Sequence, residues 1–202
     1  YRAGLKAPDR RGVRRAARIG GAGGYLHWQK YRKRKQPMPC AMAISVFDLF
    51  TIGIGPSSSH SIGPMRAARR FVERLRAGGL LDSCAEVEVR LYGSLALTGK
   101  GHGTDKAVLL GPEGATPEGI DPDEVEPRVE AIRSGGRLKL GEGPVVPWDE
   151  AKHLLFLRKE SLPQHPNGMR FTARDAAGGV LLEYTCFSVG GGFVVDESAA
   201  DA

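Results

Sequence analysis

The most constraining feature of this sequence is a change of period, from helical spacing to strand alternation, between residues 64 and 91. Pro64 suits the first turn of a helix, because its missing N–H would have no partner there, and Gly78-Gly79 supplies a stop. Four apolar residues between them recur at helical spacing: Met65, Ala68, Val72 and Leu75. Three more then alternate with charged residues, as in a half-buried strand: Val87, Val89 and Leu91.

The rest of the chain predicts more elements of both kinds and shows no internal repeat. They are a strand or short helix at 43–50, a short helix through 107–111 capped by Thr104 or Asp105, a capped helix within 120–136 ending at Gly135-Gly136, a buried strand at 154–157, and a hairpin within 170–189 turning at 177–179. We therefore expect an α+β fold, a mixed β-sheet with packed helices.

Positive charge is concentrated in residues 1–41, which hold 12 of the 29 Lys and Arg but one of the 23 acidic residues, Asp9. This segment has no regular apolar period, so we predict a disordered basic leader before a domain at 42–202. It lacks the serines of a transit peptide and the apolar run of a secretory signal. Translated upstream sequence, with the natural start at Met42 or Met38, is the interpretation we favour, and a nucleic-acid-binding arm is the alternative.

The three cysteines, Cys40, Cys84 and Cys186, show no CxxC spacing, which excludes a disulfide scaffold and a self-contained zinc or iron-sulfur site. No apolar run approaches the roughly 20 residues of a membrane helix. We expect a cytoplasmic protein with no membrane or nucleic-acid partner.

Glycine and small polar residues gather in four segments: GPSSSH (55–60), GKGHGTD (99–105), HPNGM (165–169) and SVGGGF (188–193). The first lies directly before a predicted helix N-terminus, where the helix dipole favours a carboxylate or phosphate. Three of the segments carry a histidine, His60, His102 or His165, which can move a proton near neutral pH. Each segment alone is also compatible with an ordinary turn.

Known nucleotide and nucleophile motifs do not account for these segments. GSLALTGKG has the wrong glycine spacing for a P-loop, and Gly101 replaces its magnesium-binding Ser or Thr. The sequence holds no GxGxxG after a strand and no GxSxG around a serine. The histidines lack acids or thiols at ligand spacing, so we expect no metal site in this chain.

Taken in order, the four segments resemble the β domain of the iron-sulfur-dependent L-serine dehydratases, or L-serine ammonia-lyases. SVFDLFTIGIGPSSSHSIGPMRAA is similar to that family's N-terminus, and GHGTDKAVLLG, HPNGMRF and SVGGGFV follow at the family's intervals. The resemblance covers about residues 43–195. Ser61 stands where the family has Thr, and Cys186 where it has an aromatic residue.

The resemblance implies deamination of L-serine to pyruvate and ammonia by a [4Fe-4S] cluster whose open iron acts as a Lewis acid, without pyridoxal phosphate. The cluster cysteines belong to an α domain that the sequence lacks, so the chain would be a separate β subunit or a truncated single-chain enzyme, inactive alone. The implied partners are that α domain and L-serine, in a complete enzyme expected to be a homo-oligomer serving amino-acid catabolism and gluconeogenesis.

By motif match, His60 is the implied base for the Cα proton. The implied substrate-binding residues are Ser57, Ser58, Ser59, Gly101, His102, Gly103, Thr104, Asp105, His165, Asn167 and Gly168. A second hypothesis stays open, because the domain type also resembles the allosteric substrate-binding domain of some phosphoglycerate dehydrogenases. On that reading the chain is a regulatory module that binds a small anion or amino acid without catalysis.

Overall fold

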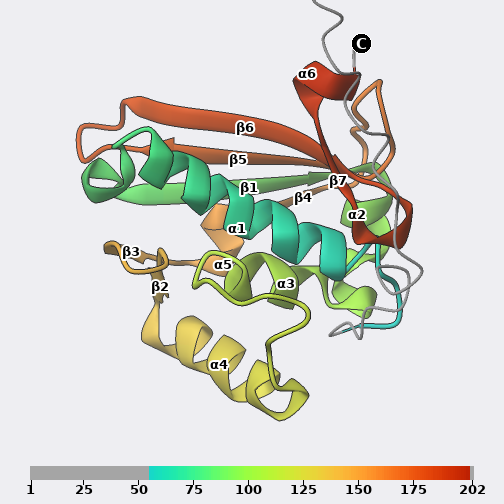
Figure 1. Ribbon diagram of the computed structural model, residues 1–202, viewed down its shortest axis with the longest axis horizontal. Coiled ribbons are helices and arrows are strands. Elements are labelled where there is room, and N and C mark those ends of the chain that lie inside the picture. Colours follow the sequence, from blue (N-terminus) through green and yellow to red (C-terminus); the bar gives the residue numbers. More distant parts are fainter. Residues whose placement is uncertain (1–54, 201–202) are drawn as a thin grey trace, which may run out of the picture. The chain divides into compact units, whose positions relative to one another are not determined.

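The computed structural model describes residues 55–200, all within a compact unit that spans Ile44–Ala202. The predicted leader at 1–41 and the predicted strand or helix at 43–50 lie outside the described residues. Within the described range the fold is α+β, with a mixed sheet and packed helices, as the sequence predicts (Figure 1).

A five-stranded sheet of order β4-β1-β5-β6-β7 forms one layer of the described unit (Figure 1). Its strands are β1 (Glu86–Tyr92), β4 (Leu154–Leu157), β5 (Gly168–Arg174), β6 (Val180–Ser188) and β7 (Val194–Asp196). β1 pairs in parallel with β4, while its pairing with β5 and the pairings β5-β6 and β6-β7 are antiparallel. A separate two-stranded ribbon pairs β2 (Arg137–Lys139) with β3 (Val145–Pro147).

The alternation of β1 sends its apolar side chains to one face of the sheet, where all three are fully buried: Val87, Val89 and Leu91. Leu154 of β4 lies beside Val89 and is buried too. The rest of β4 is half-buried, because β4 is an edge strand. The prediction of a strand at 154–157 is confirmed, but its description as buried was wrong for most of its length.

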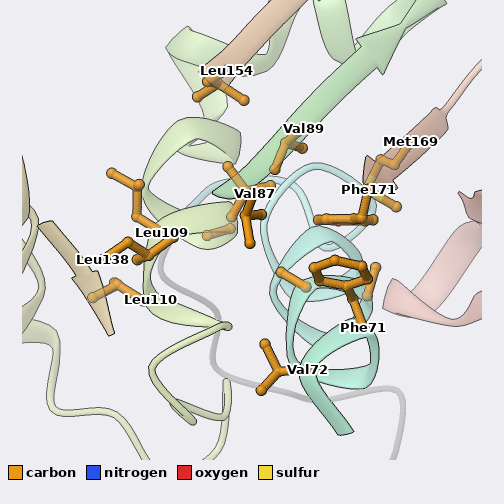
Figure 2. Close-up of a cluster of buried hydrophobic side chains, with 14 of the residues drawn as sticks. Phe71, Val72, Val87, Val89, Leu109, Leu110, Leu138, Leu154, Met169 and Phe171 are labelled. Atoms are coloured by element: carbon orange, nitrogen blue, oxygen red, sulfur yellow. The ribbon is translucent and has the colours of Figure 1, made fainter. Parts of the chain in front are cut away.

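Two helices lie against each other on the buried face of the sheet (Figures 1 and 2). They are α1 (Ile62–Ala77) and α3 (Thr104–Leu110). α1 begins and ends as its sequence predicts, with Pro64 in the first turn and Gly78 as the C-cap. Its Phe71 stacks on Phe171 of β5, with 5.4 Å between ring centroids, and Leu109 of α3 belongs to the same buried cluster as Val87 (Figure 2).

The remaining helices connect or flank these layers. They are α2 (Gly93–Thr98), α4 (Pro122–Gly135), α5 (Glu150–His153), α6 (Glu197–Ala200), and 3₁₀ turns at Leu81–Ser83, Gly99–His102 and Gly190–Gly192. None of the described helices is long and apolar enough to cross a membrane. Sequence periodicity misses α2, since six residues are too few to show a helical repeat.

The cap of α3 differs from the prediction. The residue before the helix is Gly103, in a left-handed conformation with φ of +77°, and no side chain caps the helix. Thr104 and Asp105 are already helical, and their side chains bond elsewhere. A glycine is favoured here because a Cβ disfavours positive φ.

The hairpin of β5 and β6 turns at 177–179 as predicted, with Gly178 at a φ of +85°. The Asp175 carboxylate accepts hydrogen bonds from the backbone N–H groups of Ala177 and Gly179. This is the local bonding that makes Asp a turn-forming residue.

The capped helix predicted within 120–136 is α4, whose N-cap Asp121 accepts a hydrogen bond of 3.0 Å from the Asp123 N–H. We expect Asp121→Ala to lower the free energy of unfolding by about 1 kcal/mol, because the Asp123 N–H would lose its acceptor and the helix N-terminus a favourable negative charge. Urea denaturation of the 202-residue chain measures this. Asp121→Asn should lose less, since Asn also caps, and equal losses for both variants would contradict the capping role.

Candidate functional site

His60 is the centre of a cluster of hydroxyl groups at the entrance to α1. The residue is buried, with 9% of its surface exposed. Its Nδ1 atom lies 3.1 Å from the Ser59 Oγ and 3.3 Å from the Ser57 Oγ. The backbone turns tightly here, since the Ser57 carbonyl accepts hydrogen bonds from the N–H groups of both His60 and Ser61.

The other ring nitrogen of His60 faces two hydroxyls of α2. His60 Nε2 lies 3.2 Å from the Ser94 Oγ and 3.1 Å from the Thr98 Oγ1. The sequence does not single out either residue, because GSLALTGKG stands out only by its partial likeness to a phosphate loop. Their spacing of four residues places two hydroxyls on one face of a helix, and this was the available signal.

His102 lies beside His60, with 5.0 Å between the ring centroids. Its Nδ1 lies 2.9 Å from the backbone carbonyl oxygen of Thr98. Because a carbonyl oxygen can only accept, His102 Nδ1 carries a hydrogen, and the neutral ring has its lone pair on Nε2. Thr98 therefore contacts both histidines, one through its side chain and one through its backbone.

The pKa of His60 is lowered from its ordinary value of 6.5. Burial is the main cause, since it disfavours the charged imidazolium, and the neighbouring His102 adds to the effect. A hydrogen bond with the Ser94 backbone opposes the shift. The environment thus favours neutral His60 at physiological pH, the form in which a ring nitrogen can accept a proton.

The GHGTD segment contacts the backbone of His60. The Thr104 Oγ1 is buried and donates a hydrogen bond of 2.5 Å to the His60 carbonyl. Gly55 packs so tightly on this segment that a Cβ there would lie 2.3 Å from the His102 carbonyl oxygen. Gly103 provides the left-handed turn between His102 and Thr104, and Gly101 is exposed with open space around it.

Asp105 is turned toward α4. Its Oδ2 accepts a hydrogen bond of 2.7 Å from Arg133, whose Nε donates one of 2.6 Å to Glu150. The other oxygen, Oδ1, is buried and has no hydrogen-bond partner among the described residues. The described contacts of Asp105 therefore hold α3 against α4, whereas a substrate contact by this side chain stays a prediction.

The HPNG segment reaches the same region from β5. A backbone N–H at Ser94 donates a hydrogen bond of 2.9 Å to the Pro166 carbonyl, so this segment contacts the start of α2. His165 Nδ1 accepts from the Asn167 N–H at 3.1 Å, which leaves the hydrogen of a neutral ring on Nε2. Gly168 begins β5, and a Cβ there would lie 2.8 Å from the Leu162 side chain.

Ser188, at the end of β6, connects the serine segment to the HPNG segment. Its hydroxyl donates a hydrogen bond of 2.7 Å to the Ser59 carbonyl, and its carbonyl accepts one of 3.1 Å from the buried Asn167 amide. Gly63 of α1 makes room for it, since a Cβ there would lie 1.8 Å from the Ser188 Oγ. Ser188 was counted among the four segments by sequence, but not as a site residue.

The four segments thus converge around His60, through contacts to Ser59, the His60 carbonyl and α2. In the described part of the chain, the backbone N–H groups of Ser58 and Ser59 have no carbonyl acceptor. Together with the serine hydroxyls, they form a polar surface at the N-terminal end of α1, which favours an anion. A proton acceptor beside an anion-binding loop can remove a proton from a carbon next to a carboxylate.

The described residues contain no group of three or more His, Cys, Asp or Glu that could hold a metal ion. Cys84 and Cys186 are both buried, and burial raises the pKa of the Cys186 thiol to about 12. A thiol must lose its proton to ligate iron, so neither residue has the setting of a cluster ligand. Cys40 lies outside the described residues.

Comparison with known proteins gives the same family over most of the chain. The family model described as "Serine dehydratase beta chain" matches residues 45–199. An L-serine dehydratase of Streptomyces coelicolor is 56% identical over 161 residues, which are 80% of this chain and 35% of that protein. An L-serine dehydratase of Mycobacterium tuberculosis is 52% identical over 79% of this chain and 34% of that protein. L-serine dehydratase TdcG of Escherichia coli is 48% identical over 76% of this chain and 34% of that protein.

The chain spans about a third of the length of these curated relatives. The family match covers all four glycine-rich segments, and the identities over more than three quarters of this chain are far above what a shared fold alone requires. The chain therefore belongs to the serine dehydratase beta chain family.

Proposed function

We propose that this chain is the β portion of an L-serine ammonia-lyase, which converts L-serine to pyruvate and ammonia together with an α portion that carries the cluster ligands. The observation that supports this most strongly is the placement of His60. It is buried, its pKa is lowered, and its Nδ1 faces the serine segment that begins the helix. The longer relatives of the chain are named L-serine dehydratases.

The serine segment is the proposed site for the substrate carboxylate. The hydroxyls of Ser57 and Ser59 and the N–H groups of Ser58 and Ser59 are the donors available to it. The N-terminus of the 16-residue helix α1 adds a favourable field for negative charge. This arrangement would fix the carboxylate directly beside the His60 ring.

His60 is the proposed base. The Cα of serine is one bond from the carboxylate, so a substrate held by Ser57–Ser59 has its Cα hydrogen next to the imidazole. Transfer of that proton breaks the C–H bond, forms an N–H bond on the ring and leaves the electron pair to expel the hydroxyl group. The surrounding His102, His165 and Asn167 are proposed to orient the amino and hydroxyl groups.

The [4Fe-4S] cluster that the family resemblance implies does not fit the described residues of this chain. Cys84 and Cys186 are core thiols, and among the described residues neither belongs to a group of three or more His, Cys, Asp or Glu that could hold a metal ion. We assign the cluster to the α portion. The residues of this chain then act on the carboxylate and on the Cα proton.

The test is to compare the 202-residue chain alone with the chain co-purified anaerobically with the α portion of the Streptomyces coelicolor relative. We expect the chain alone to hold no stoichiometric iron and to form no pyruvate from L-serine, because its described residues provide no ligand set. The complex should bind iron and release pyruvate and ammonia in equal amounts. Iron in the lone chain, or an iron-loaded complex without activity, would contradict the proposal.

A regulatory anion-binding domain is the alternative, and ligand titration separates the two. Calorimetry of the complex with L-serine, D-serine and phosphate should show binding of L-serine in preference to the other two if the site is catalytic. A sensor for anions in general should bind phosphate at least as well and should not distinguish the two enantiomers.

A further inference from the structure

We propose that Thr98 acts as a positioning residue that holds neutral His60 in the Nε2–H tautomer, so that Nδ1 is the atom that accepts the substrate proton. The tautomer is assigned from the hydrogen bonds of the described residues. The second half of the statement rests on the proposed function, in which His60 is the base.

The Thr98 hydroxyl carries a single hydrogen. The Thr98 Oγ1 lies 3.0 Å from the Ser94 backbone carbonyl, which can only accept, so the hydroxyl hydrogen is used in that bond. The same Oγ1 lies 3.1 Å from His60 Nε2. With its hydrogen on the carbonyl, the Thr98 oxygen accepts at the ring, and we assign His60 Nε2 as the donor. The Ser94 Oγ, 3.2 Å from the same nitrogen, then faces this N–H as a second acceptor.

The lone pair of the His60 ring then lies on the opposite nitrogen, Nδ1. A neutral imidazole has one N–H and one lone pair, so an Nε2–H ring has its lone pair on Nδ1. That atom faces the hydroxyls of Ser57 and Ser59, where the carboxylate is proposed to bind. The lone pair therefore points to the side of the ring on which Cα would lie, while Nε2 remains bonded to α2.

In the proposed reaction the proton moves from the substrate Cα to His60 Nδ1. The Cα–H bond breaks, its electron pair stays on the substrate, and the proton forms a new N–H bond at Nδ1. The resulting imidazolium keeps its donor bond from Nε2 to the Thr98 Oγ1, so the ring does not need to turn during the reaction. Thr98 therefore keeps the ring orientation constant before and after proton transfer.

The neighbouring histidines provide an internal contrast. The Thr98 carbonyl imposes the Nδ1–H tautomer on His102, whereas its hydroxyl imposes Nε2–H on His60. His165 and His153 each accept a backbone N–H at Nδ1, from Asn167 and Asp149, and are Nε2–H when neutral. Among the described histidines, His102 alone is expected as Nδ1–H.

Long-range ¹H–¹⁵N correlation spectra of the ¹⁵N-labelled 202-residue chain test the assignment, because the two tautomers give distinct coupling patterns. The spectra are recorded at about pH 8, above the ordinary histidine pKa of about 6.5. We expect Nε2–H for His60 and Nδ1–H for His102. An Nδ1–H pattern for His60 in the unmodified chain would overturn the proposal.

Substitutions at Thr98 test the cause. Thr98 is exposed, so Thr98→Val keeps the shape of the side chain, loses the hydroxyl and removes little core packing. We expect Thr98→Val to give a mixture of His60 tautomers, and Thr98→Ser to restore Nε2–H. Leu97→Ala is the matched control on the same helix, 62% exposed, and should leave the spectrum unchanged. An unchanged His60 pattern in Thr98→Val would show that Thr98 does not set the tautomer.

The consequence for catalysis is measured in the complex with the α portion. Thr98→Val should lower kcat by roughly 10- to 100-fold, the usual range for losing a partner that orients a histidine, with little change in KM. Thr98→Ser should recover most of the loss. A raised KM with unchanged kcat would refute the positioning role. If the unmodified complex is inactive, the proposed function fails, while the tautomer is still decided by the spectra.

Discussion

His60→Ala in the complex with the α portion is expected to lower kcat for L-serine by about 10²- to 10⁴-fold, with KM largely retained. The alanine removes the proposed proton acceptor but leaves the serine hydroxyls and backbone N–H groups of residues 57–59 in place. Binding of the carboxylate should therefore persist while proton removal fails. Steady-state kinetics under anaerobic conditions measure both constants.

The matched control is His153→Ala, which changes a histidine of α5 whose described contacts are with Asp149 and Trp148. It should change kcat less than about threefold, within the range of surface substitutions. Near-normal turnover of His60→Ala, or a loss confined to KM, would move the base to another residue.

The pH profile gives a second readout of the same prediction. Burial and the nearby His102 lower the pKa of His60, and a base is active only when neutral. The acid limb of kcat/KM in the unmodified complex should therefore have its midpoint below pH 6.5. A midpoint above 6.5 would mean that the controlling group is not a histidine in this environment.

Phe71→Ala is expected to lower the free energy of unfolding by about 3–5 kcal/mol, the usual cost of emptying a phenylalanine site in a core. Phe71 is fully buried and stacks on Phe171 where α1 meets the sheet (Figure 2). For a domain of this size, that loss corresponds to a fall in Tm of roughly 6–20 °C. Urea and thermal denaturation of the 202-residue chain measure the two quantities.

Val180→Ala is a suitable control, because Val180 lies at the start of β6 with 56% of its surface exposed. Its effect should stay within about 0.5 kcal/mol. A loss below about 1 kcal/mol for Phe71→Ala would indicate that the contact between α1 and β5 is not a main source of stability.

Elements with a strong local signal could be predicted from the sequence. α1 has a periodic apolar face, a proline in its first turn and a glycine stop, and α4 has Asp121 and Gly136 at its ends. The hairpin of β5 and β6 has a glycine turn between two apolar runs. In each case the residues that determine the structure lie within one stretch of chain.

Features that depend on distant residues could not be predicted. β4 has the composition of an interior strand, but its place at the edge of the sheet follows from the crossover that brings it beside β1. Thr104 is a residue type that often caps helices, but its hydroxyl instead donates a hydrogen bond to the His60 carbonyl, 44 residues earlier in the chain.

The same distinction applies to the site. The four glycine-rich segments are visible in the sequence because glycine and small polar residues mark tight backbone turns. The hydroxyls of Ser94 and Thr98 cannot be recognised in the sequence, because they belong to a short helix and their role depends on which residue the helix faces in the fold. The bonds from Ser188 to Ser59 and from Thr98 to His60 exist only in the folded chain.

The parallel pairing of β1 with β4 leads us to expect a particular order of assembly. β5 and β6 adjoin in sequence and can close early, whereas β1 reaches β4 only after the intervening chain, which carries α2, α3 and α4, has been ordered. Closing a long segment costs entropy before its contacts form, so such pairings are slow. The helix that holds His60 Nε2 belongs to that segment. We therefore expect the hairpin to form before α2 reaches His60, so that Nε2 acquires the Ser94 and Thr98 hydroxyls later than Nδ1 acquires the local hydroxyls of Ser57 and Ser59.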